Sequence, residues 1–118
     1  EELAERFLTA VENKAVICGA MARIPVKGTP LGELKQVSDE KMAHIIAVLR
    51  LSGGNVIRDI CVHPATQAAL TSGANLMVVE TGAIPRDTEY SPTEWANVSI
   101  VRAREILTNA GWKQEAFL

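Results

Sequence analysis

The sequence predicts an α/β fold in which three parallel strands alternate with helices. Three short, continuous apolar runs, at residues 16–26, 56–62 and 76–80, are typical of strands that are buried on both faces of a sheet. Segments with apolar residues at helical spacing separate these runs, and helices between successive strands favour a parallel arrangement. A chain of 118 residues has the size of one domain, so we expect a single hydrophobic core within residues 1–118.

The amino-terminal segment predicts a helix followed by the first strand. Residues 1–14 carry apolar side chains at helical spacing, and the sequence opens inside this helix without a capping residue. These side chains are Leu3, Phe7, Leu8 and Val11. The apolar stretch that follows contains β-branched residues and predicts a strand that begins near Val16. Gly28 and Pro30 interrupt this stretch and predict a loop.

Ser38 predicts the start of a second helix, because its hydroxyl can accept a hydrogen bond from a backbone N–H group in the first helical turn. Asp39 and Glu40 follow it, at positions where the helix dipole favours acidic side chains. Gly53 and Gly54 predict the end of this helix. Its apolar stripe consists of Met42, Ile45, Ile46 and Leu49.

The second half of the chain predicts two more pairs of a strand and a helix. A short helix at residues 65–72 should follow the second strand, with Pro64 at its first position and Gly73 at its end. A loop at residues 81–90 should follow the third strand. The last helix should begin at a capping box formed by Ser91, Pro92, Thr93 and Glu94. This helix should end at Gly111, and its apolar residues are Trp95, Val98, Val101, Ile106 and Leu107.

The composition argues against several classes of protein. The formal net charge is −2, from 12 basic and 14 acidic residues, whereas domains that bind nucleic acid carry a basic excess. No apolar run approaches the roughly 20 residues that cross a bilayer, and the acidic amino end differs from a signal peptide. Cys18 and Cys61 lack the spacing of a disulfide framework. We therefore expect a cytoplasmic protein that binds neither nucleic acid nor membrane.

Alternation along the second predicted strand separates its side chains into two sets. Successive residues of a strand point to opposite faces of the sheet. One face should pack against the helices, and it carries Val56, Arg58, Ile60 and Val62. The other face carries Ile57, Asp59, Cys61 and His63.

Other ligand-type side chains occur near the carboxyl ends of the first and third predicted strands. Met21 and Arg23 lie near the end of the first strand, and Glu80 closes the third. Parallel α/β folds bind their ligands at this edge of the sheet, which predicts a small-molecule site there. An ion pair between Arg23 and Glu80 without a ligand role is the alternative interpretation.

The remaining motifs predict no chemistry of their own. Cys61 and His63 could provide two metal ligands from one strand face, but no further ligands occur at the spacing of a structural zinc site. We therefore expect no metal site within this chain. Cys18 lies among apolar residues and should be a small core residue, and His44 should be a half-exposed helix residue. The glycines do not form a phosphate-binding loop.

Four segments follow one another within residues 16–80 in an informative order. They are Arg23-Ile24-Pro25-Val26-Lys27-Gly28-Thr29-Pro30-Leu31, then Ile46-Ala47-Val48-Leu49-Arg50-Leu51, then the second strand, and then Gly73-Ala74-Asn75-Leu76. This series resembles the carboxyl-terminal part of the biotin synthase-like radical S-adenosylmethionine enzymes, with their biotin-and-thiamin-synthesis-associated region. The resemblance implies the last three strand–helix units of a TIM-type β/α barrel.

The resemblance also implies cofactors. Enzymes of this family cleave S-adenosylmethionine reductively at a [4Fe–4S] cluster that is bound by a CxxxCxxC loop. This sequence contains no such loop, and its two cysteines cannot supply three ligands of that kind. S-adenosylmethionine and the [4Fe–4S] cluster are therefore implied for a longer protein, of which this chain would be one part.

Individual residues carry over from the family by their position in its pattern. The backbone contact to the adenine of S-adenosylmethionine falls at Ile24, beside Arg23. The side chain that faces the substrate in biotin synthase falls at Met21, where an Asn is expected. The ligand to the auxiliary [2Fe–2S] cluster falls at Arg58 or Asp59, and the departures at Met21 and Asp59 suggest a different substrate. The other residues that would line the substrate cavity are Cys61, His63 and Glu80.

We therefore expect the portion of such an enzyme that lines the substrate and S-adenosylmethionine, without complete catalytic machinery of its own. The alternative is a stand-alone α/β module that binds a ligand or a partner without radical chemistry. An aldolase-like barrel segment is disfavoured, because no Lys stands at a strand end for Schiff-base chemistry. Three strands from a barrel would expose two sheet edges and an apolar face. We thus expect self-association, or pairing with an amino-terminal barrel portion.

Overall fold

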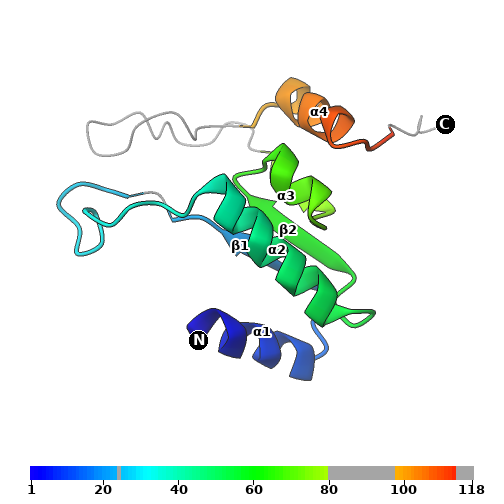
Figure 1. The fold of residues 1–118 in the computed structure, drawn as a ribbon, viewed down its shortest axis with the longest axis horizontal. Coiled ribbons are helices and arrows are strands. Elements are labelled where there is room, and N and C mark those ends of the chain that lie inside the picture. The colour runs from blue at the N-terminus through cyan, green and yellow to red at the C-terminus, as the bar shows by residue number, and fades with distance from the viewer. Residues whose placement is uncertain (24, 80–97, 114–118) are drawn as a thin grey trace.

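The computed structural model describes residues 1–23, 25–79 and 98–113. The elements in chain order are α1 (Glu2–Glu12), β1 (Ile17–Met21), α2 (Asp39–Gly53), β2 (Asp59–His63), α3 (Gln67–Thr71), β3 (Leu76–Met77) and α4 (Ile100–Asn109) (Figure 1). The three strands form one parallel, open sheet in the order β1-β2-β3. The predicted α/β class, with parallel strands alternating with helices, is therefore confirmed.

Parallel pairing brings the carboxyl ends of the strands to one edge of the sheet. Met21 at the end of β1 pairs with His63 at the end of β2. Backbone hydrogen bonds extend this ladder beyond both strands, because the Asp59 N–H donates to the Val16 carbonyl at 3.0 Å and the Ala22 N–H donates to the His63 carbonyl at 2.8 Å. β3 pairs in the same direction with the other side of β2. Any side chains placed near the carboxyl ends are thus neighbours.

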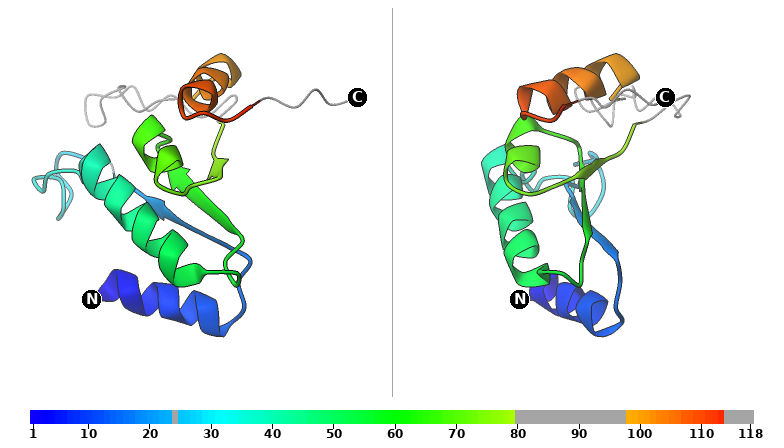
Figure 2. Two further views of the ribbon diagram at one scale, coloured as in Figure 1. Left: turned by 45° about the vertical axis from the view of Figure 1, so that its right-hand side comes forward. Right: turned by 90° about the vertical axis from the view of Figure 1, so that its right-hand side faces the viewer.

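Helices α2 and α3 cover one face of the sheet, as both views in Figure 2 show. Ile60 and Val62 of β2 are fully buried on this face, together with Ile46 of α2 and Ala69 of α3. The predicted assignment of Ile60 and Val62 to the helix side is therefore confirmed. Cys18 of β1 is partly buried against the same core, in line with its expected role as a small core residue.

The start of β2 differs from the prediction. The N–H groups of Val56 and Ile57 donate to the Gly53 carbonyl at 3.0 and 3.2 Å, so these residues form a turn at the end of α2 and the strand begins only at Asp59. Ile57 is fully buried in the core from this turn, instead of lying on the open face of the strand. Arg58, predicted to face the helices, is exposed.

The other two strands are shorter than predicted. β1 ends at Met21, and a loop of turns that contains Pro25 leads from it to α2. Proline cannot donate to a strand ladder, which accounts for a loop at this position. β3 comprises Leu76 and Met77, and the next two described residues, Val78 and Val79, lie outside it.

The helix caps were predicted with mixed success. Ser38 caps α2 as expected, because its hydroxyl accepts a hydrogen bond from the Lys41 N–H at 3.2 Å. The cap of α3 is Thr66, whose hydroxyl accepts from the Ala69 N–H at 3.2 Å. Pro64 consequently precedes α3 and does not occupy its first position. The hydroxyl of Thr66, rather than the fixed backbone of proline, thus sets the start of this helix.

The last helix begins later than predicted. α4 starts at Ile100, and the hydroxyl of its cap, Ser99, accepts a hydrogen bond from the Arg102 N–H at 3.2 Å. Val98, assigned to this helix from the sequence, therefore lies before it. The predicted capping box at residues 91–94 and Trp95 lie outside the described residues.

Helices α1 and α4 lie at the periphery of the core. The ring of Phe7, which is the buried residue of α1, reaches the end of α2 near Gly53. Leu3 and Leu8 of α1 remain 63% and 58% exposed. α4 lies against α3 (Figure 1), where the Gln67 side chain donates from Nε2 to the Asn109 carbonyl at 3.0 Å. No helix in the described part of the chain is long and apolar enough to cross a membrane.

Candidate functional site

The face of the sheet opposite α2 and α3 is open among the described elements (Figure 2). Alternate strand positions supply its side chains, and several of these are apolar and exposed. Ile17 and Met21 of β1 are 55% and 74% exposed, and Leu76 of β3 is 37% exposed. An exposed apolar surface of this kind is typical of a region that contacts a ligand or another polypeptide.

A small pocket lies on this open face near the carboxyl ends of β1 and β2. Its volume is about 180 Å³. The lining residues are Gly19, Ala20, Met21, Cys61, His63 and Val78. Three of the candidate residues from the sequence, Met21, Cys61 and His63, therefore lie together. Strand alternation and parallel register bring them together, and both follow from the order of the strands.

Gly19 provides the space that the pocket occupies. It lies between Ile17 and Met21 on the open face and pairs with Cys61 across the ladder. A Cβ atom at this position would clash with the Cys61 carbonyl oxygen, because real Cβ atoms do not approach another atom that closely. Any larger residue would push β1 and β2 apart, so the row of open-face side chains has a gap at Gly19.

The two ionisable groups of the pocket differ in their exposure. His63 is only 8% exposed. Cys61 is partly buried, and this burial raises the pKa of its thiol above the ordinary value. The Cys61 thiol is therefore protonated at neutral pH, which makes it a weak nucleophile in the absence of an activating partner.

Asp59 lies away from this pocket, at the amino end of β2. It lies four positions before His63 along the strand, which corresponds to roughly 13 Å. Its carboxylate accepts hydrogen bonds from Arg58 Nε at 2.9 Å and from Asn75 Nδ2 at 2.9 Å. The bond from Arg58 is the main reason why the pKa of Asp59 is lowered; burial opposes this effect, and Asn75 adds to it.

The candidate residues after β1 and β3 are placed only in part. The guanidinium of Arg23 donates from Nη2 to the Leu34 carbonyl at 3.0 Å, so Arg23 holds the loop that connects β1 with α2. Ile24 and Glu80 lie outside the described residues, and so does the predicted ion pair between Arg23 and Glu80.

A polar network at the amino ends of β2 and β3 was not predicted from the sequence. Arg50 of α2 donates from Nε to the Gly73 carbonyl at 2.8 Å, from Nη1 to the Arg58 carbonyl at 2.9 Å and from Nη2 to Asn75 Oδ1 at 2.9 Å. The same Asn75 oxygen accepts from the buried Ile60 N–H at 2.7 Å. We refer to Arg50 and Asn75 with these partners as the Arg50–Asn75 clasp.

The clasp explains why residue 73 is a glycine. The position of Arg50 in the sequence could also have indicated the clasp. A Cβ atom at Gly73 would lie 2.8 Å from the Cβ of Arg50, so the side chain of Arg50 passes directly over this position. Gly73 also has a φ of +123°, which disfavours other residues. An arginine between Leu49 and Leu51 was the available signal, since a charge beside an apolar helix stripe needs partners.

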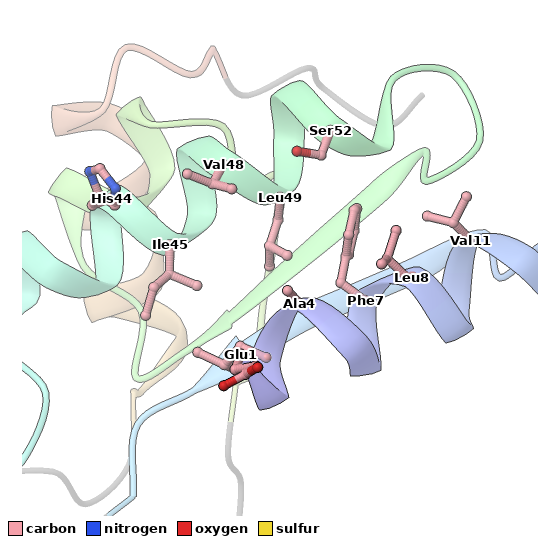
Figure 3. A pocket seen from close by; sticks show the side chains of 11 residues that line it. Glu1, Ala4, Phe7, Leu8, Val11, His44, Ile45, Val48, Leu49 and Ser52 are labelled. Atoms are coloured by element: carbon pink, nitrogen blue, oxygen red, sulfur yellow. The ribbon is translucent and has the colours of Figure 1, made fainter.

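A second hollow, between α1 and α2, contains none of the candidate residues. Its volume is about 430 Å³, and Figure 3 shows its side chains. The apolar lining residues are Leu3, Ala4, Phe7, Leu8, Val11, Ile45, Val48 and Leu49. Glu1, His44 and Ser52 also contribute, and His44 is exposed, in line with its assignment from the sequence. Among the described residues that line this groove, no acid–base or nucleophilic side chain forms a hydrogen bond or an ion pair with another.

The described residues do not fit a [4Fe–4S] cluster. Cys18 packs against the core on the helix side of β1, whereas Cys61 lies on the open side of β2. Their thiols therefore face different sides of the sheet. Within the described part of the chain, no three His, Cys, Asp or Glu side chains are grouped so that they could hold a metal ion. A cluster of that type would need ligands from elsewhere.

Comparisons with known proteins gave no relative. No family model matches the chain, and no curated protein and no solved structure matches it significantly. A function for this protein therefore has to be argued from its own residues.

Proposed function

We propose that this chain is the carboxyl-terminal, ligand-lining portion of a biotin synthase-like radical S-adenosylmethionine enzyme. The observation that carries the proposal is the placement of Met21, Cys61 and His63 at one end of a parallel sheet, on the face away from the helices. In a β/α barrel this face lines the interior, and ligands bind at the carboxyl ends of the strands. The three residues would then face a bound substrate.

The contacts of the clasp support the same proposal. Arg50 belongs to one of the segments on which the resemblance to the family rests, and Gly73 and Asn75 belong to another. These segments contact each other directly through the hydrogen bonds from Arg50. The shared pattern therefore includes residues that hold α2 to the strands, which is what consecutive barrel units require.

The pocket residues would orient a substrate and exclude water from it. Met21 and Val78 contribute apolar surface, and Cys61 carries no charge while its thiol is protonated, so in this state the pocket favours an uncharged part of a substrate. S-adenosylmethionine, when bound to the complete enzyme, would supply the radical that starts the reaction. Because the cysteines of this chain do not fit the cluster, its ligands would come from an amino-terminal portion.

Calorimetric titration with S-adenosylmethionine tests the proposal on the protein. We expect binding that is weakened by Arg23→Ala and by Glu80→Gln. Lys27→Ala, a substitution of an exposed residue in the same loop, is the matched control and should leave the affinity unchanged. If Arg23→Ala lowers only the thermal stability, then its bond to Leu34 is purely structural, and Arg23 does not belong to the site.

The coding sequence upstream of Glu1 provides an independent test. A CxxxCxxC motif in the same reading frame is expected for the radical enzyme. A start codon directly before Glu1 would contradict the proposal and favour a stand-alone ligand-binding module. Anaerobic reconstitution of this chain with iron and sulfide should give no absorption near 400 nm, and a brown protein would contradict the assignment of the cluster to another portion.

A further inference from the structure

Two sulfur groups and one imidazole from two neighbouring strands line the pocket on the open face. Cys61 and His63 lie two positions apart on β2, and Met21 is the Cα partner of His63 across the ladder. Neighbouring strands are about 4.8 Å apart, and residues on the same face of one strand are about 6.6 Å apart. Side chains of these lengths span such gaps, so a thiol, an imidazole and a thioether can meet at one point.

The backbone leaves this meeting point open. Gly19 is the Cα partner of Cys61 and contributes no side chain between Ile17 and Met21. The thioether of Met21 is on a long, unbranched side chain that is 74% exposed, so it can turn toward the pocket without disturbing the core. The remaining wall is apolar and includes Val78.

We propose that Cys61, His63 and Met21 form a binding site for one Cu(I) ion. Thiolate and thioether sulfur favour Cu(I), and imidazole also suits copper. Zinc prefers four nitrogen, thiolate or carboxylate ligands, and the described residues offer no third Cys, His, Asp or Glu to such a site. The strand order predicts the site only when methionine is counted as a donor.

Binding requires the loss of one proton and no change of oxidation state. The Cys61 S–H bond breaks, the sulfur coordinates the ion, and the proton leaves to solvent. The imidazole of His63 ligates the ion through one ring nitrogen only. The other ring nitrogen can keep a protein partner, as is common for ligating histidines. The site does not depend on radical chemistry, so this inference goes beyond the proposed function.

Anaerobic titration of the reduced protein with Cu(I), in competition with bathocuproine disulfonate, tests the site. We expect one ion per chain and about one proton released per ion at neutral pH. Cys61→Ser and Met21→Leu should each lower the affinity at least about tenfold, since even the outer partners of metal ligands contribute that much. Cys18→Ser is the matched control, because its thiol faces the helices, and it should retain the wild-type affinity.

Several outcomes would overturn the site. An equal loss of affinity in Cys18→Ser and Cys61→Ser would show binding to any thiol, and an unchanged affinity in Met21→Leu would remove the thioether. One ion per two chains would indicate a site between copies. Met21 is exposed, so its substitution keeps the test valid if a cysteine variant unfolds. X-ray absorption should find two sulfur atoms and one nitrogen around copper, and three sulfurs would contradict the ligand set.

Discussion

Asn75→Ala should lower the free energy of unfolding by about 3 kcal/mol. The Oδ1 atom of Asn75 accepts from Arg50 Nη2 at 2.9 Å and from the Ile60 N–H at 2.7 Å. Alanine removes both bonds at once, together with the bond that Asn75 Nδ2 donates to Asp59 Oδ1. Because Ile60 is fully buried, its N–H group then has no access to water in place of the lost acceptor.

The magnitude follows from these two bonds. A hydrogen bond contributes about 1 kcal/mol net, and one to a charged donor such as Arg50 contributes about 1.5 to 3 kcal/mol. A buried N–H that is left without a partner costs a further 1 to 3 kcal/mol or so. Arg50 keeps its bonds to the Gly73 and Arg58 carbonyls, so part of the clasp survives. At face value these contributions add up to about 3.5 to 7 kcal/mol, and because Arg50 retains its other bonds we expect a loss near the lower end, about 3 to 4 kcal/mol.

Urea denaturation followed by circular dichroism measures the effect. Asn55→Ala is the matched control, because Asn55 is exposed in the turn between α2 and β2, and its stability should change by less than about 0.5 kcal/mol. A double-mutant cycle with Arg50→Met should give a coupling energy of about 1 kcal/mol or more. If Asn75→Ala and Asn55→Ala have the same free energy of unfolding, the bonds of Asn75 do not stabilise the fold and the reasoning is wrong.

Four further substitutions and measurements test other contacts. Because the pKa of Asp59 is lower in the folded protein, Asp59 stabilises the fold at pH values above its unfolded-state pKa of about 4, and this stability is lost as the pH falls through the folded-state pKa. Asp59→Asn should therefore lose less stability than wild type on acidification. Urea midpoints of the two proteins that fall in parallel would contradict this. Burial raises the pKa of Cys61, so in Cys18→Ser the alkylation rate of the folded protein should reach half its maximum at a higher pH than that of the urea-unfolded protein, and equal midpoints would show an ordinary thiol. Gly19→Ala should cost about 2 kcal/mol in urea denaturation, because its Cβ would meet the Cys61 carbonyl oxygen, and wild-type stability would mean that the strands separate freely. Phe7→Ala removes the buried anchor of α1, so limited proteolysis should cleave this helix first, and wild-type resistance would contradict the assignment.

Local patterns in the sequence predicted the elements that local interactions determine. Ser38 caps α2 because the cap needs only its own hydroxyl and an N–H group three residues later. Ile60 and Val62 face the helices because alternation along a strand fixes the face of every residue. The start of β2 was wrong because Val56 and Ile57 have strand propensity, but the Gly53 carbonyl holds their N–H groups in a turn.

The clasp could not be derived in the same way. Arg50 and Asn75 are 25 positions apart, and their bond exists only after α2 and β3 have been placed on β2. Periodicity assigns a residue to a face of a helix but does not identify its partner. The candidate site was predictable only in part. Alternation along β2 correctly grouped Asp59 with Cys61 and His63 on one face, but it does not show that Asp59 lies at the other end of the strand, away from the pocket.

The two ends of the sheet differ in the contacts of their side chains. Polar side chains at the amino ends bond to one another and to the backbone, whereas those at the carboxyl ends of β1 and β2 surround a pocket. Parallel α/β folds commonly separate stability from ligand binding in this direction. Asn75→Ala should therefore lower stability with little effect on the affinity of the folded protein for a ligand, and Met21→Leu should do the reverse. If both variants changed both properties equally, the separation between the two ends would be refuted.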